Sequence, residues 1–112
     1  MEKFDKINDL VKKFRDEREW TQFHNPKDLA ISLSIEASEL LECFQWKTDK
    51  EAISENLENI KYEIADVAVY LLHLCNQLDI NLLEAIEEKM KLNEIKYPIS
   101  KAKGTSKKYN QL

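Results

Sequence analysis

The chain has 112 residues, enough for one domain with a thin hydrophobic core. Apolar residues make up 43% of it and charged residues 34%, which suits a soluble helical protein better than a disordered or membrane protein. One glycine and two prolines leave too little turn chemistry for a multi-stranded sheet, and a formal net charge of -4 argues against nucleic acid as the main partner. We expect a single all-α domain over residues 1–112 that binds neither nucleic acid nor membrane.

The first predicted helix covers residues 2–19, where apolar side chains recur at helical spacing and form one amphipathic stripe. The pattern stops at a connector that carries Trp20, Phe23 and His24 and is unusually aromatic for a short loop. Aromatic residues in such a connector either plug the end of a bundle or form stacking walls in a nucleotide site. Both readings remain open at this point.

The second predicted helix begins at Asn25 and Pro26, because an amide cap followed by a ring already fixed near helical φ is typical of a helix start. We expect it to run to about Lys47. From Leu29 to Phe44 it is apolar nearly all the way round, and a helix of that kind must be covered on more than one side. Four short helices supply too little cover, so the pattern predicts a homo-oligomer.

The third predicted helix starts near Asp49, since Thr48 and Glu51 have the spacing of a capping box. Its first part, through Asn59, is polar and is expected to be a separate turn or a mobile loop. Residues 60–78 are apolar on most faces and predict a buried helix.

The last predicted helix follows a break near Asn81, which has cap-like spacing to Glu84, and it extends to about Lys96 before Pro98 ends it. Residues 99–112 then form a basic tail. The tail is either a solvated terminus or a clamp on an anionic substrate, because lysines neutralise phosphate. Its lysines are Lys101, Lys103, Lys107 and Lys108.

Two cysteines, Cys43 and Cys75, both fall within apolar helical pattern. With no secretory leader in the sequence, they are expected to be reduced, buried thiols of a cytoplasmic protein. The longest apolar run, residues 64–75, is far below the ~20 residues that span a bilayer. No transmembrane segment is predicted.

The strongest chemical signal is a set of carboxylates at helical spacing. Glu36, Glu39 and Glu42 lie three residues apart on the second predicted helix, and Glu63 and Asp66 repeat the spacing on the third. Glu36 and Glu39 alone would more often face solvent or form salt bridges. The second pair changes this balance, since its apolar neighbours predict burial and buried acids are rare unless paired or bound to metal. Packed face to face, the two helices would form a metal site from four carboxylates.

Four hard oxygen donors without cysteine favour Mg²⁺, or Mn²⁺, over zinc. A di-iron site would need a Glu three residues before a His, which neither His24 nor His73 has. Mg²⁺ held by carboxylates keeps positions for water and substrate phosphates, which suggests hydrolysis of a phosphoanhydride. The alternative is a non-enzymatic helical oligomer or partner protein in which the metal only adds stability.

The segments EASELLECFQW and EIADV together resemble the MazG-type nucleoside triphosphate pyrophosphohydrolases, whose pattern is Glu-x-x-Glu, a spacer and Glu-x-x-Asp. Three further segments, REWTQFHNPKDLAISL, KMKLNEIKYP and SKKY, are similar to the short dCTP pyrophosphatase branch of that family. The resemblance extends from about Phe4 to Tyr109.

This resemblance implies an all-α four-helix bundle assembled as a tetramer, a dimer of dimers. The implied reaction splits a nucleoside triphosphate, dCTP or a related pyrimidine nucleotide, into monophosphate and pyrophosphate with Mg²⁺. A same-fold enzyme for another nucleotide, such as dUTP or phosphoribosyl-ATP, remains an alternative. The implied metal ligands are Glu36, Glu39, Glu63 and Asp66. From the chemistry of the cluster we expect Glu39 and Glu36 to be catalytic as well, with Glu39 as the general base, because no histidine lies within the motif. The implied substrate-binding residues are Trp20, His24, Trp46, Lys89, Asn93, Lys96, Tyr97, Lys108 and Tyr109.

Overall fold

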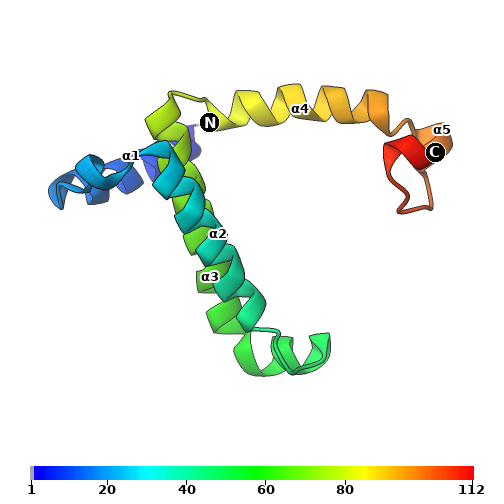
Figure 1. The fold of residues 1–112 in the computed structure, drawn as a ribbon, viewed down its shortest axis with the longest axis horizontal. Coiled ribbons are helices and arrows are strands. Elements are labelled where there is room, and N and C mark those ends of the chain that lie inside the picture. Colours follow the sequence, from blue (N-terminus) through cyan, green and yellow to red (C-terminus); the bar gives the residue numbers. More distant parts are fainter. Residues whose placement is uncertain (1) are drawn as a thin grey trace. The chain divides into compact units, whose positions relative to one another are not determined.

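A computed structural model describes residues 2–112, and these residues form helices and short connections with no strand among them, so the predicted all-α class is confirmed. Figure 1 labels the elements. In chain order they are α1 (Glu2–Glu17), η1 (Trp20–Phe23), α2 (Pro26–Glu42), α3 (Asp49–Leu78), α4 (Leu82–Lys96), α5 (Ile99–Ala102) and η2 (Tyr109–Gln111). Two compact units divide the chain: the first ends at Asp79 and contains α1 to α3, and the second is Ile80–Leu112.

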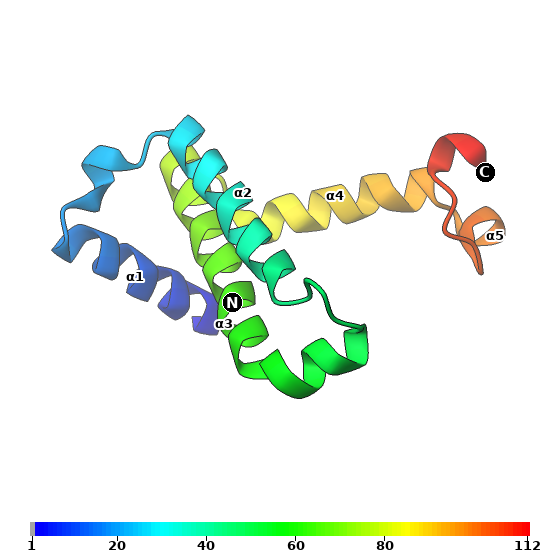
Figure 2. The ribbon, with the colours of Figure 1, turned by 60° about the horizontal axis from the view of Figure 1, so that its bottom comes forward.

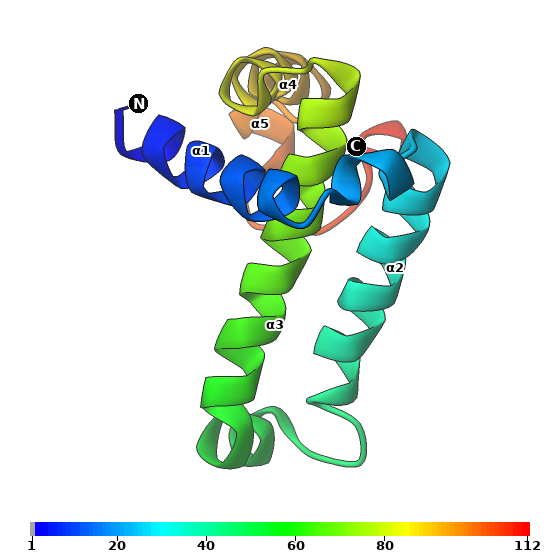
Figure 3. The same cartoon turned by 90° about the vertical axis from the view of Figure 1, so that its left-hand side faces the viewer.

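The first unit is organised by α2 and α3, which lie side by side and run in opposite directions, joined by residues 43–48 (Figure 3). The antiparallel arrangement follows from this short connection, which reverses the chain. Leu29 of α2 is only 2% exposed, and α3 contributes most of the other buried apolar side chains. These are Ala52, Ile60, Leu72 and Cys75.

The predicted helix starts are confirmed by their capping hydrogen bonds. The Asn25 side chain accepts a bond of 2.9 Å from the backbone N–H of Asp28 at the start of α2. Thr48 does the same for α3 at 3.2 Å, and Asn81 for α4 at 3.1 Å. In each case the side chain satisfies one of the donors that the first helical turn leaves free.

The connection between α2 and α3 differs from the prediction. Helix α2 ends at Glu42 instead of about Lys47, and the next residues form turns in which Trp46 has a φ of 63°. The side chain of Asn56 donates a bond of 3.0 Å to the carbonyl oxygen of Cys43, which is free to accept it because the helix has stopped.

The polar start of α3 is helical, so the expectation of a loop there was wrong. Asn56 has a non-helical backbone (φ -123°, ψ 16°) and marks a kink, and Figure 2 shows the first turns of α3 bending away from the rest of the helix. The Thr48 cap and the buried Ala52, which is 0% exposed, hold this segment in a helix despite its polar composition.

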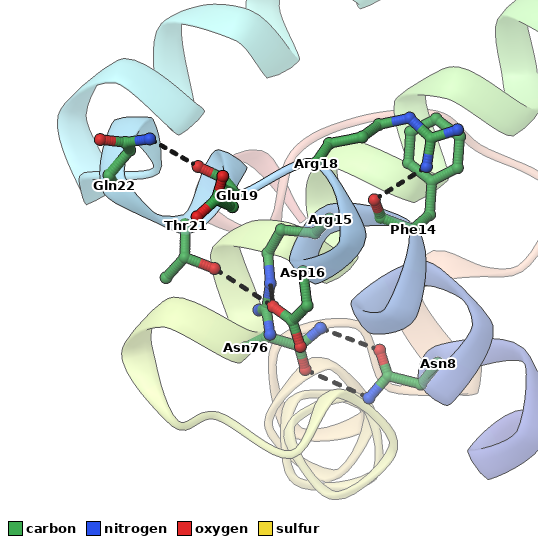
Figure 4. Close-up of polar contacts among 9 residues, drawn as sticks. All are labelled: Asn8, Phe14, Arg15, Asp16, Arg18, Glu19, Thr21, Gln22 and Asn76. Carbon is green, nitrogen blue, oxygen red and sulfur yellow. Dashed lines mark hydrogen bonds and ion pairs between the residues drawn. The ribbon is translucent and has the colours of Figure 1, made fainter.

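Helix α1 is tied to α3 by a reciprocal amide pair. Asn8 donates to the side-chain oxygen of Asn76 at 3.1 Å, and Asn76 donates back to Asn8 at 3.0 Å (Figure 4). At the other end of α1, Asp16 accepts bonds from Arg15 at 2.8 Å and Thr21 at 3.2 Å, which anchors the connector that carries Trp20. Helix α1 is therefore held against α3 and positions η1, while its predicted apolar stripe stays largely uncovered within the chain, with Leu10 63% exposed.

The second unit folds its tail back onto the end of α4. The Lys96 ammonium lies 4.8 Å from the centre of the Tyr109 ring, and the rings of Tyr97 and Tyr109 meet edge to face at 6.2 Å. None of the helices in residues 2–112 has both the length and the apolar composition needed to cross a membrane.

We predict that Leu29→Ala lowers the free energy of unfolding by about 3 kcal/mol, because it leaves a cavity where α2 meets its neighbours. Denaturant unfolding followed by circular dichroism measures this change. Lys27→Ala, an exposed change in the first turn of the same helix, is the control and should cost less than about 0.5 kcal/mol. Equal costs for the two variants would contradict the packing described for Leu29.

Candidate metal centre and adjoining cavity

Three of the four predicted ligands come together between α2 and α3. Glu36 and Glu39 of α2 and Glu63 of α3 each place a carboxylate oxygen within 4.8 Å of the others. Asp66 lies nearly one turn after Glu63 and lines a cavity together with Glu36. The face-to-face packing of α2 and α3 is what brings carboxylates 27 residues apart in the chain into one cluster.

The burial expected for the second pair is only partly present. Glu63 is half-buried, whereas Asp66 is exposed. The neighbouring Ile64, apolar yet 53% exposed, shows the reason: α3 turns part of its apolar surface away from the other helices of its own unit.

The cluster is electrostatically strained in the absence of a cation. Removal from water raises the pKa of Glu36 to about 7, with further contributions from hydrogen bonding and repulsion by Glu39 and from the charges of Asp66 and Glu63. The pKa of Glu63 is also raised, first by removal from water and then by the charges of Glu39 and Asp66. The repulsion disfavours the ionised forms of Glu36 and Glu63, so a bound cation would relieve it.

The donor set fits a hard divalent cation. Oε2 of Glu36 and Oε2 of Glu63 are both buried and have no hydrogen-bond partner among residues 2–112. A buried carboxylate oxygen without a partner is costly, and metal coordination is one of the few ways to satisfy it. Carboxylate oxygens are the ligands that Mg²⁺ and Mn²⁺ prefer.

A cavity of about 430 Å³ extends from the cluster. Its acidic part is formed by Glu36 and Asp66, and the remainder is aromatic and aliphatic, so with a cation held at the carboxylates it would suit a ligand with an anionic group and a flat ring. The lining residues are Leu10, Val11, Phe14, Trp20, Glu36, Asp66, Val69, Tyr70 and His73. Trp20, predicted as an aromatic wall, lies here and meets the ring of Phe14 edge to face at 5.6 Å.

Two lining residues, Tyr70 and His73, were not predicted as part of the site. Their signal in the sequence is positional: they follow Asp66 by four and seven residues, so helical periodicity puts all three on one face of α3. An aromatic residue and a histidine in an apolar helix were more readily explained as core residues.

A second hollow, of about 420 Å³, opens on the cluster through Glu39 and Glu63. It adds Glu42, the third carboxylate in the α2 series, and Asn59, which lies one turn before Glu63. The charge of Glu42 contributes to the raised pKa of Glu63. Both residues are thus close enough to act on the cluster, although the sequence pattern did not assign them a role there.

The ring of His24 contacts that of His73 inside the first unit in a tilted arrangement, with ring centres 4.5 Å apart and an interplanar angle of 59°. The two side chains are only 8% and 4% exposed. Burial lowers the pKa of both rings, and the Arg15 guanidinium lowers them further. His24 lines a smaller cavity of about 290 Å³, whose walls share Trp20 and Tyr70 with the first.

The other predicted substrate-binding residues lie elsewhere. Trp46 is 92% exposed and follows the C-terminal end of α2, whereas Trp20 precedes its N-terminal end. Helix α2 has 17 residues and is therefore about 25 Å long, so the two indoles of one chain do not face each other across a base. The remainder belong to the second unit: Lys89, Asn93, Lys96, Tyr97, Lys108 and Tyr109.

Comparison with known proteins decides the family. The model of the MazG-like family matches residues 31–112, a range that includes all four predicted ligands. The chain belongs to the MazG-like family. The resemblance read from the sequence motifs is thereby confirmed.

This MazG-like chain is similar to curated relatives named dCTP pyrophosphatase 1. It is 37% identical to the Homo sapiens protein and 35% identical to that of Mus musculus, in each case over 111 residues that cover 95% of this chain. The chain spans about 65% of the length of these relatives. A solved structure, that of a pyrophosphatase from Archaeoglobus fulgidus, matches with a TM-score of 0.81 and 44% identity, covering 85% of this chain and 92% of that one.

The raised pKa of Glu36 predicts a pH-dependent stability in metal-free protein. The Glu36 carboxyl keeps its proton up to about pH 7 in the native state, whereas it loses the proton near pH 4.5 in the unfolded chain. The contribution of Glu36 to stability is therefore greatest below pH 4.5 and is lost as the pH rises through about 7. We expect Glu36→Gln to raise the melting temperature in EDTA at pH 8 and to have little effect at pH 5.

Differential scanning calorimetry at both pH values tests this expectation. Glu58→Gln, at an exposed position of α3, is the matched control and should leave the melting temperature unchanged at either pH. An equal response of the two variants at pH 8 would show that Glu36 is not under electrostatic strain.

Proposed function

We propose that this protein hydrolyses a nucleoside or deoxynucleoside triphosphate, dCTP or a related pyrimidine nucleotide, to the monophosphate and pyrophosphate in a Mg²⁺-dependent reaction. The observation that carries the proposal is the cluster of Glu36, Glu39 and Glu63, which opens on a cavity with an aromatic wall. The printed names of the relatives, dCTP pyrophosphatase 1 and a pyrophosphatase, support the same reaction class.

Glu36, Glu39, Glu63 and Asp66 would hold the cation, Mg²⁺ or Mn²⁺. When bound, it would neutralise charge on the phosphate oxygens and make water a better nucleophile near neutral pH. The unpartnered Oε2 atoms of Glu36 and Glu63 support their assignment as ligands. The assignment of Asp66 rests on its place beside Glu36 at the cavity.

We assign Glu39 as the general base. A water molecule attacks the α-phosphorus, its proton passes to the Glu39 carboxylate, and pyrophosphate leaves with the electrons of the broken P–O bond. Glu39 is a member of the cluster and also lines the second hollow, so a water molecule can reach its carboxylate from that hollow. Glu36 is the second catalytic candidate, since its carboxylate lies beside that of Glu39.

The base would lie against the aromatic part of the cavity. Stacking on an aromatic ring such as Trp20 contributes about 1–3 kcal/mol per base and is the same for every base, so it supplies affinity and not identity. His24, which lines the adjoining cavity with Trp20, is the predicted polar contact.

The second unit would bind the phosphates and the sugar. At the end of α4 the ring of Tyr109 lies beside the Lys96 ammonium and meets the ring of Tyr97 edge to face, which gives a cationic group next to an aromatic pair. Lysine ammonium groups neutralise phosphate as point charges and would hold the leaving pyrophosphate. The same role is proposed for Lys89, Asn93 and Lys108.

We also propose that the protein is a homo-oligomer, a tetramer built as a dimer of dimers. Apolar side chains along α2 remain uncovered within the chain, including Ile31 at 47%, Ile35 at 53% and Leu41 at 71% exposure. Trp20 and Trp46 flank opposite ends of the same helix, so two α2 helices packed antiparallel would bring Trp46 of one copy to Trp20 of the other. Such a pairing would complete the aromatic walls of each site.

Both cysteines are free thiols, Cys75 buried and Cys43 half-buried. Unoxidised cysteines are typical of proteins in reducing compartments. This supports the proposed cytoplasmic location.

The reaction is tested by incubating the purified protein with Mg²⁺ and a panel of canonical and modified nucleoside triphosphates, followed by chromatographic separation of the products. We expect monophosphate and pyrophosphate in equal amounts, fastest for one pyrimidine nucleotide, and no product in EDTA. Diphosphate with inorganic phosphate would overturn the assignment of the cleaved bond. No product from any nucleotide, with Mg²⁺ still raising the melting temperature, would identify a purely structural metal site.

Glu63→Gln should lower kcat by about a thousandfold or more, because it removes a charged ligand from the cluster while keeping its shape. Glu58→Gln, five residues earlier on α3, should retain full turnover. Circular dichroism must show that both variants remain folded. Retained activity in Glu63→Gln would remove Glu63 from the ligand set.

The oligomer is tested by light scattering at micromolar concentration, where we expect about four times the chain mass of 13.2 kDa. Trp46→Ala should raise KM by about tenfold, since one stacking interaction is lost, and should leave the melting temperature nearly unchanged. A monomeric mass would rule out the assembly. A lower melting temperature with unchanged KM would make Trp46 a packing residue.

A further inference from the structure

His73, like the neighbouring His24, is a buried histidine that lines a cavity and whose Nδ1 atom has no hydrogen-bond partner among residues 2–112. Its side chain is only 4% exposed, and its Nδ1 atom is buried without a hydrogen-bond partner among the described residues. At the same time its ring lines the 430 Å³ cavity that begins at Glu36 and Asp66. Buried polar atoms are nearly always satisfied, so an orphan atom on a cavity-lining side chain points to a partner that enters the cavity.

The position of His73 along α3 fits the dimensions of a nucleoside. Asp66, Tyr70 and His73 occupy one face of the helix, and Asp66 and His73 are separated by two turns, about 10 Å. A nucleotide separates its charged 5′ end from the edge of its base on this scale. If the phosphates lie at the end of the cavity formed by Glu36 and Asp66, the base extends past Tyr70 toward His73.

The surroundings of His73 keep its imidazole neutral. The pKa of His73 is lowered to about 4, chiefly by burial and then by the neighbouring His24 ring and the Arg15 guanidinium. A neutral imidazole carries one N–H donor and one acceptor, so it can distinguish base edges by their hydrogen-bonding pattern. A charged ring would donate from both nitrogens and lose the acceptor.

The neighbours of His73 fix the ring. It contacts the tilted ring of His24 at 4.5 Å and meets Tyr70 edge to face at 5.6 Å. A polar atom held rigidly in an apolar pocket discriminates strongly, because a base with the wrong edge leaves it unsatisfied and cannot move it aside.

We propose that His73 is a specificity-determining residue, whose Nδ1 forms a hydrogen bond with the edge of the substrate base. This inference rests on the proposed nucleotide hydrolysis and assigns to the base a polar contact in addition to His24. Stacking by Trp20 gives no base identity, and the carboxylates are assigned to the cation and not to the base, so a buried polar atom in the intervening cavity supplies the missing discrimination.

The test compares the selectivity of three variants, measured as the ratio of kcat/KM for the preferred pyrimidine triphosphate to that for the other pyrimidine. His73→Phe keeps an aromatic ring and removes the polar atoms. His73→Asn keeps a polar amide atom near the Nδ1 position. Cys75→Ala changes a buried residue of the same helix that lines none of the cavities described, and it controls for general loosening of α3.

We expect His73→Phe to lower the selectivity ratio by about tenfold, the size of one hydrogen bond in a buried site. The Mg²⁺ concentration for half-maximal turnover should not change, because the carboxylates are intact. His73→Asn should retain the ratio to within about threefold, and Cys75→Ala should lower only the melting temperature. If His73→Phe is insoluble, His73→Met fills the same space without a strong hydrogen-bonding group and should give the same loss.

Three outcomes would overturn the inference. An unchanged ratio in His73→Phe, with turnover of all substrates lowered equally, would make His73 a packing residue only. A loss of selectivity in His73→Asn as large as that in His73→Phe would exclude Nδ1 as the reading atom. If the unmodified protein hydrolyses none of the nucleotides, the proposed function itself fails and the inference fails with it. If it hydrolyses them and His73→Phe keeps full selectivity, only the inference fails.

Discussion

The repulsion among carboxylates at the interface of α2 and α3 is the constraint on which the rest of the first unit depends. Packing two apolar helices against each other is favourable, but here the packing also forces Glu36, Glu39 and Glu63 to within 4.8 Å. A fold selected only for stability would replace such a cluster with apolar side chains of similar size. Its presence, with two buried oxygens left unpartnered, indicates that the two helices are held together in part to present negative charge.

The same two helices explain why the cavity has two chemically different ends. Helix α3 carries Asp66 and His73 on one face, and α1 crosses this face, fixed by the Asn8–Asn76 pair and by the anchoring of its C-terminal end at Asp16. The crossing closes the aromatic end of the cavity, while the carboxylate end lies where α2 and α3 face each other. With a cation held at the acidic end, the cavity would complement a nucleotide, whose phosphates are negative and whose base is a flat ring.

Much of this arrangement follows from the sequence, because its determinants are local. Side-chain caps at Asn25, Thr48 and Asn81 fix the helix starts within one turn, and the three-residue spacing of acids fixes which carboxylates share a face. The end of α2 was misjudged because apolar periodicity continues through Phe44 and no glycine or proline marks the stop. The carbonyl oxygen of Cys43, left free by this stop, accepts a bond from the distant Asn56 side chain, a contact that no local pattern contains.

The roles of Tyr70 and His73 were hidden for a related reason. In a sequence alone, a histidine within an apolar helix is most simply explained as a core residue whose polar atoms are satisfied. Only the three-dimensional structure reveals that Nδ1 of His73 has no partner among residues 2–112 and that its ring borders a cavity. Trp46 is the opposite case. The motif resemblance predicts that its indole is an aromatic wall of the nucleotide site, but within the single chain the indole is 92% exposed. A bulky indole in a left-handed backbone conformation, surrounded by solvent, is unfavourable in an isolated chain. Its position becomes favourable if a second copy covers it, so the same oligomer that would bury the apolar face of α2 would also complete the site.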